Sequence, residues 1–347
     1  MSETGLIALM AVIGVLVVGT LALSAYAVIM RFVHAADAKA AEQFNERWRD
    51  PLLGAVANPD LVPSVQALVR DEDAIRFLGF VIEYARRLRG QEKGVLKDMA
   101  KPFLPRMAER VHARRVEMRA WAVQTLGTLG LPEYADEVVA ALDDPSPLVA
   151  MVAARALARA ETPQYAPAVL ERLERFTGWD RHFLASMLAA IGPSASGAFR
   201  DGLADEGRAP WIRGVMAEAL LQQGDFMAGD IAAEVVRTAH ERDLLASALR
   251  LVAAVGRPEH VKVIRLHHDS DDAVVRAQAL RALGVLGGVD DVQVLVGAME
   301  DLSPWPALYA ARGARDAGGR GVLADLVASG HPSAALAEQV LAEEGGR

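Results

Sequence analysis

Histidine and carboxylate residues are neighbours at three places in this sequence, and such neighbours are candidates for binding a metal ion. The run His267–Asp269 is followed by two more aspartates, and the pairs His240–Glu241 and Glu259–His260 lie upstream. A zinc or hard-ion site needs several ligands that converge on one point. Adjacent residues on a short turn point in different directions, so these groups do not make a converging set. We therefore predict no metal site and no cofactor.

The sequence also lacks the residues and motifs of the common hydrolytic and nucleotide-dependent enzymes. It contains no Cys, which excludes a disulfide framework, a thiolate metal site and a cysteine nucleophile. No G-x-S-x-G, Walker or Rossmann pattern occurs, and the 8 histidines are scattered. We expect that the chain is not an enzyme, and we name no catalytic residue.

Three tryptophans are the candidates for contact with a partner. Trp179, Trp211 and Trp305 recur at one position of an internal repeat, two residues before a column rich in arginine. Aromatic residues along such an edge are favoured as interface anchors, so we assign these three to partner binding. The alternative is a hydrophobic staple at N′ of a helix, because the residue five positions later belongs to the expected core.

The elements that carry these residues follow from a repeat of 31–32 residues. Its most regular columns are an alanine, a leucine four residues later and a glycine four residues after that. The glycine column reads Gly130, Glu161, Gly192, Gly224, Gly256, Gly287 and Gly318. The leucine column reads Leu126, Leu157, Leu188, Leu220, Val252, Leu283 and Ala314. The alanine column reads Ala122, Ala153, Leu184, Met216, Ala248, Ala279 and Ala310.

Each repeat has the pattern of a helical hairpin. The apolar columns form one stripe on a second helix, and the glycine is expected to end that helix in the left-handed conformation. A first helix precedes it, for example over Ala135–Leu142 or Val292–Met299, and an Asp/Pro/Ser turn is expected to supply the N-cap of the second. One hairpin cannot bury its own apolar face, so the units must stack into a solenoid.

The pattern V-R-x-x-A-x-x-x-L-G-x-L-G at Val275–Gly287, echoed at Met118–Gly130, resembles the short bacterial HEAT repeats also found in phycobilisome lyases. The resemblance covers Lys97–Arg347, about seven units and a partial one. It implies an all-α fold, an α-solenoid of HEAT-like hairpins, and a binding scaffold more than any one activity. In such stacks, arginines of the column beside the tryptophans are expected to bridge to acidic turn residues of a neighbouring repeat. They are Arg119, Arg181, Arg213 and Arg276.

The N-terminal region contains a candidate transmembrane helix. Residues Gly5–Met30 carry no charge over 26 positions, which is long enough to span a bilayer with some tilt. The competing interpretation is a signal peptide cleaved after Ala25–Ala27. A signal peptide typically has a basic n-region and a shorter apolar core. This region has neither, so we favour an uncleaved anchor.

The flanks of this span predict its orientation. No Lys or Arg precedes it, whereas Arg31, Lys39, Arg47 and Arg49 follow it, which places the N-terminus outside and the bulk of the chain in the cytoplasm. The predicted organisation is a tail at 1–4, the transmembrane helix at 5–30, a juxtamembrane helical linker at 31–50, a membrane-proximal helical segment at 51–96 and the solenoid at 97–347. The excess of 32 Arg over 5 Lys, with 64 Ala, suggests a GC-rich bacterial genome and hence the inner membrane.

Charge is distributed unevenly along the chain. The net charge of −8 argues against a nucleic-acid partner, and residues 120–347 alone carry −11. Residues 86–119 carry +7, and basic residues near a membrane are attracted to anionic lipids. We assign a membrane-surface role to a basic patch at the end of the membrane-proximal segment; the alternative is a solvated helix face. Its residues are Arg86, Arg87, Arg89, Lys93, Lys97 and Lys101.

Together these features predict a membrane-anchored HEAT-repeat scaffold that binds a membrane-associated protein, with the expected concave face of second helices as its docking surface. Two alternatives stay open. One is an enzyme or enzyme subunit of the HEAT-lyase or di-iron type, although the di-iron hydroxylases of this kind need several His–Glu pairs. The other is a periplasmic binding array, if the N-terminus is cleaved.

Overall fold

The computed structural model describes residues 42–159 and 163–343, and every regular element within them is helical. The predicted tail and transmembrane helix, and most of the predicted linker, lie outside the described residues. Within the described ranges no helix is both long and apolar enough to cross a bilayer. The chain divides into two compact units, and the boundary in the sequence falls between Glu109 and Arg110.

The first unit is a small helical domain with an aromatic core. Residues 42–57 are helical, and the elements that follow are η1 (Pro59–Leu61), α2 (Val62–Leu68), α3 (Ala74–Ala85), α4 (Gly90–Ala100), η2 (Lys101–Phe103) and α5 (Leu104–Arg110). Trp48 is 2% exposed and meets the ring of Phe77 edge-on, with 4.8 Å between ring centroids. Phe77 in turn meets Phe103, so the core ties the first helix to α3 and η2.

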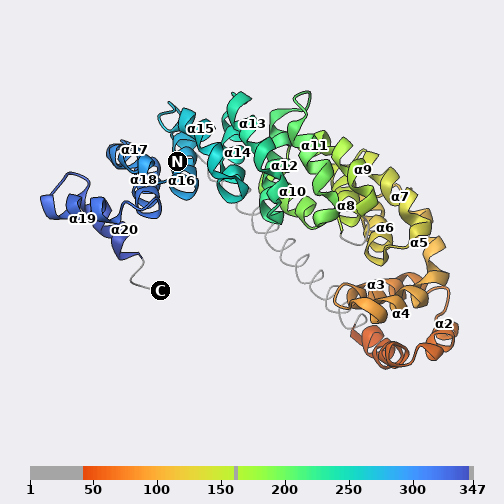
Figure 1. Cartoon of the computed structure of the whole chain (residues 1–347). Coiled ribbons are helices and arrows are strands. Elements are labelled where there is room, and N and C mark those ends of the chain that lie inside the picture. Colours follow the sequence, from red (N-terminus) through yellow and green to blue (C-terminus); the bar gives the residue numbers. More distant parts are fainter. Residues whose placement is uncertain (1–41, 160–162, 344–347) are drawn as a thin grey trace, which may run out of the picture. The chain divides into compact units, whose positions relative to one another are not determined.

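The second unit is a stack of helical hairpins, as the repeat predicts. Its second helices are α6 (Val116–Leu129), α8 (Pro147–Leu157), α10 (Arg181–Ala189), α12 (Pro210–Gln223), α14 (Arg242–Val255), α16 (Ala273–Leu286), α18 (Pro304–Asp316) and α20 (Ala334–Ala342). The first helices between them are α7 (Ala135–Ala140), α9 (Ala166–Glu171), α11 (Ser196–Ala204), α13 (Gly229–Thr238), α15 (Val261–Ile264), α17 (Val292–Gly297) and α19 (Arg320–Ser329). Figure 1 shows the odd-numbered first helices from α7 to α17 in one row and the even-numbered second helices from α6 to α18 in another.

The predicted columns form the core of this stack. Leu126, Leu283 and Ala279 are at most 2% exposed, because their helices pack against one another and against the first helices. Small residues let neighbouring second helices approach closely. A Cβ added to Gly127 would lie 2.2 Å from the Cβ of Ala156, so the two helices touch backbone to backbone at this point.

The glycine column was predicted to be left-handed throughout, and this is wrong at two positions. Gly130 and Gly224 have φ near +60°, as expected, but Gly256 and Gly287 are extended, with φ of −74° and −72°. At both of the extended glycines, the backbone N–H of the next residue donates to a side chain three residues further on, His260 Nδ1 or Asp291 Oδ2. These side chains hold the exit from the helix in an extended conformation.

Two arginines make the predicted bridges to acidic turns. Arg119 donates two hydrogen bonds to Asp144, at 2.7 and 2.9 Å, and one to the carbonyl of Ala113 at 3.0 Å. Arg276 binds Asp301 in the same bidentate way, 25 residues ahead. Arg213 departs from the prediction, because its Nε donates to the carbonyl oxygen of Leu203 rather than to a carboxylate.

Candidate functional site

The three predicted tryptophans all lie at the start of second helices, but not all at N′. Trp179 precedes α10, whose N-cap is Asp180, whereas Trp211 and Trp305 are the second residues of α12 and α18. The prediction of one common N′ position is therefore wrong for two of them. The cause is a proline at the first position of α12 and α18, which starts these helices about one turn earlier than α10.

Two of the tryptophans pack against an aromatic residue four positions later in the sequence. Trp179 stacks on Phe183 with 5.8 Å between ring centroids and 25° between planes. Trp305 packs on Tyr309 at 6.2 Å and 30°. Trp305 is 64% exposed and Trp179 is 36% exposed, whereas Trp211 is half-buried. Two of the three predicted anchors therefore present aromatic pairs to solvent.

An arginine from the preceding repeat completes each aromatic pair. The guanidinium carbon of Arg155 on α8 lies 5.9 Å from the ring centroid of Phe183, and that of Arg281 on α16 lies 5.9 Å from Tyr309. The groups Arg155–Phe183–Trp179 and Arg281–Tyr309–Trp305 thus repeat one arrangement at two places in the stack. We call them the arginine–aromatic triads.

Both triad arginines occupy a repeat position that the sequence reasoning missed. This position lies two residues before the leucine column, and every member except Glu218 is exposed or half-buried. We call it the second-helix row, and it reads Gln124, Arg155, Ser186, Glu218, Arg250, Arg281 and Arg312. The sequence does contain a signal, since four of the seven positions are arginine. The apolar columns are more regular, however, and they mark only the buried face of the second helices.

The arginines of this row fall into two classes. Arg250 and Arg312 have carboxylate partners, with 2.7 Å from Arg250 to Glu218 and 2.7 Å from Arg312 to Glu343. Arg155 and Arg281 are exposed and contact aromatic rings instead. In the described part of the chain neither of these two forms an ion pair. No carboxylate of the described residues therefore takes up their hydrogen-bond donors.

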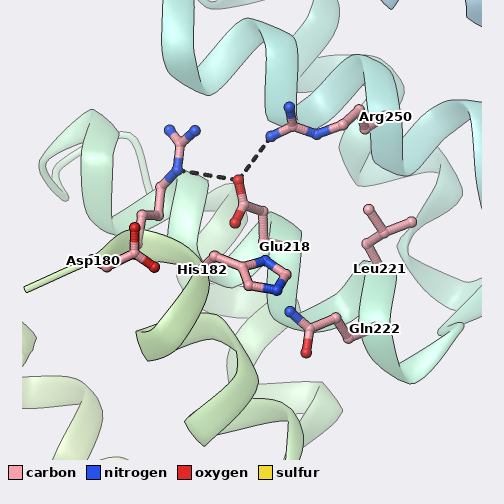
Figure 2. A pocket seen from close by; sticks show the side chains of 7 residues that line it. Asp180, His182, Glu218, Leu221, Gln222 and Arg250 are labelled. Atoms are coloured by element: carbon pink, nitrogen blue, oxygen red, sulfur yellow. Dashed lines mark hydrogen bonds and ion pairs between the residues drawn. The ribbon is translucent and has the colours of Figure 1, made fainter.

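A polar hollow of about 400 Å³ is lined by residues of α10, α12 and α14 and by Asp180, the N-cap of α10. Its floor is Glu218, whose side chain is 8% exposed and whose Oε1 lies 3.1 Å from Nε of Arg181 and 2.7 Å from Nη2 of Arg250 (Figure 2). Ser247 Oγ donates to the same oxygen at 3.3 Å. Two guanidinium groups thus share one buried carboxylate. The remaining lining residues are His182, Leu221 and Gln222.

The predicted metal-capable neighbours are used inside the fold or point apart. His267 Nε2 lies 2.8 Å from the carbonyl oxygen of Val236, whereas His268 Nδ1 lies 2.8 Å from that of Arg265. Glu241 accepts hydrogen bonds from two backbone N–H groups and caps α14. In residues 42–159 and 163–343, no group of three or more His, Asp or Glu is arranged to hold a metal.

The predicted basic patch lies in the first unit, from the end of α3 through α4 to η2. Arg86, Arg87, Arg89 and Lys101 are exposed, and Lys93 and Lys97 are half-buried. Within the patch, Arg87 pairs with Glu83 at 3.0 Å and Lys101 pairs with Asp98 at 2.8 Å. These pairs are solvent-exposed, so they neutralise the patch only weakly.

Comparison with known proteins identifies part of this architecture. An engineered protein solved by crystallography is similar at 15% identity, covering 87% of this chain and 95% of its own, but with a TM-score of only 0.35. No curated protein matches the chain. The model of the family described as HEAT repeats matches residues 104–189, which contain α5 to α10. This part of the chain is therefore similar to HEAT repeats, in agreement with the resemblance seen in the sequence.

Proposed function

We propose that this chain is a scaffold that binds a protein partner through the solvent-facing side of its second helices. The observation that carries this proposal is the pair of arginine–aromatic triads. Tryptophan, tyrosine and arginine are the residues most enriched among energetically dominant interface contacts. Large aromatic side chains exposed in register on a stacked array are typical of a docking surface, and HEAT repeats commonly serve protein interaction.

We propose further that the scaffold is held at a bacterial inner membrane by the apolar segment 5–30, with the repeats in the cytoplasm. The support is the charge-free length of this segment and the positive residues that follow it. The partner would then be membrane-associated. The orientation is tested by fusing the C-terminus to a reporter enzyme that works only in the periplasm, and activity of this reporter would contradict the proposal. N-terminal sequencing of the mature chain would reveal cleavage near Ala27.

Site-specific photocrosslinking tests the docking surface. A photoreactive residue replaces Ser186 or Val285, both exposed on second helices, in cells that make the chain naturally. Matched positions on first helices are Glu234 and Lys262, which are also exposed. We expect the second-helix positions to yield the same crosslinked protein, identified by mass spectrometry, and the first-helix positions to yield none. Crosslinks from the first helices alone would overturn the proposal.

A further inference from the structure

We propose that the second-helix row binds an acidic segment of a partner protein, whose carboxylates pair with Arg155 and Arg281. This inference rests on the proposed scaffold function and names the chemistry of the partner. It follows from three features of the described residues: the contact of these arginines with aromatic rings, the lack of a carboxylate partner for them, and the net negative charge of the surrounding repeats.

The aromatic rings hold both guanidinium groups ready for a ligand. Each guanidinium carbon lies 5.9 Å from the centroid of a ring, and each ring is braced by a tryptophan. A guanidinium that contacts an aromatic face keeps the donors at its edge free, and these match the two oxygens of a carboxylate. Less side-chain entropy is lost on binding when the arginine is already positioned.

The other arginines of the row show what the triad arginines lack. Arg250 and Arg312 sit at the same repeat position, and each already binds a glutamate of this chain at 2.7 Å. A carboxylate is thus the partner that this position accepts in two repeats. At Arg155 and Arg281 no such partner comes from the described part of the chain, and we assign the equivalent carboxylate to the partner protein.

The surrounding charge selects a short acidic segment over an extended anionic surface. Residues 120–347 carry a net charge of −11, so a bilayer of anionic lipid or a nucleic acid would be repelled by most of this array. Carboxylates near the row include Glu218, which is buried under two arginines, Glu343, which binds Arg312, and Asp180 at the start of α10. A peptide with a few carboxylates can reach the triad arginines while avoiding the acidic turns.

Fluorescence anisotropy on the full chain tests this inference, with a labelled peptide of alternating glutamate and alanine as the probe. The test variant carries Arg155→Gln and Arg281→Gln. The control variant carries Arg237→Gln and Lys262→Gln, which remove the same charge from exposed positions on first helices. We expect at least about a tenfold loss of affinity in the test variant, since two charge-assisted pairs are removed, and less than about twofold in the control. Unchanged melting temperatures of both variants confirm folding.

Three outcomes would overturn the acidic-segment proposal: no binding of the peptide, equal losses in the two variants, or equally tight binding of an oligonucleotide or of anionic vesicles at the same arginines. A variant with Phe183→Leu and Tyr309→Leu keeps the charges and removes the rings, and it should lose part of the affinity. The photocrosslinking experiment separates the two proposals. If the partner still crosslinks at Ser186 and Val285 in the Arg155→Gln, Arg281→Gln protein with undiminished yield, the scaffold function stands and the role of the arginines fails.

Discussion

Two aspartates in the turns between first and second helices join neighbouring repeats, because each binds an arginine of the preceding repeat. Asp144 accepts both a bidentate hydrogen bond from Arg119 and the backbone N–H of Ser146, and Asp301 repeats this with Arg276 and Ser303. The hydrogen bond from Arg119 is the main cause that holds the pKa of Asp144 below its ordinary value. Since this carboxylate is 10% exposed, water screens the pair only in part.

We predict that Asp144→Asn destabilises the repeats at neutral pH and weakens their acid sensitivity. A carboxyl whose pKa is lowered by folding stabilises the native state above its unfolded pKa, and this stabilisation is lost as pH falls through the lowered folded pKa. The loss at pH 7 should be about 1.5–3 kcal/mol, as expected for hydrogen bonds to a charged group. Urea denaturation at neutral and acidic pH measures it, and the difference from the wild type should shrink in acid.

Glu234→Gln is the matched control for this substitution. Glu234 also binds an arginine, Arg237, but both side chains are more than half exposed, at 57% and 55%. An ion pair this exposed contributes little to stability, because water and salt screen it. Equal effects of the two substitutions at neutral pH would contradict the view that Asp144 joins neighbouring repeats.

At the level of the helices, the sequence predicted the buried face well and the solvent face poorly. The burial of Leu283 and Ala279 could be predicted from their columns, because a buried position requires the same kind of residue in every repeat. The contact between Arg155 and Phe183 could not be read, because it joins residues 28 positions apart and depends on how two helices are placed side by side. The extended conformation of Gly256 was likewise hidden, since it depends on the side chain of His260.

Close packing of second helices leads to a prediction about glycine. Gly284 faces Gly313 across the α16–α18 contact, and a Cβ at Gly284 would lie 2.3 Å from the Cα of Gly313. Backbone atoms cannot rotate away, so Gly284→Ala must push the helices apart and should destabilise the protein by about 1–3 kcal/mol. Thermal and urea unfolding of the purified protein measure this change.

Gly297 provides the opposite case on a first helix. It has helical dihedrals, and a Cβ there would meet no atom within 4 Å. Gly297→Ala should therefore stabilise the protein by about 0.5–1 kcal/mol, because alanine loses less backbone entropy on folding. A loss of stability at Gly297 similar to that at Gly284 would show that the helix contact is not the cause.

Across the whole molecule, charge changes sign along the chain. Residues 86–119 carry +7 and residues 120–347 carry −11, and the second-helix row places arginines within the acidic part. Composition predicted the first contrast, because it needs only a count along the sequence. The second needs the fold, since Arg155 and Arg281 are ordinary surface arginines until the stack brings each of them against a ring.

The basic patch leads to a prediction for the full chain in lipid. A fluorophore attached at Gln91, an exposed position beside Arg89, should be quenched by spin-labelled lipid more strongly in anionic bilayers than in neutral ones. Replacing Arg86, Arg87 and Arg89 with glutamine should remove this difference, because each arginine near an anionic surface contributes about 1 kcal/mol. The neutral bilayer is the internal control, since the proposed anchor inserts into both. Quenching that is the same in the two lipids before substitution would show that the patch is an ordinary solvated face of the first unit, and membrane attachment would then rest on the apolar segment alone.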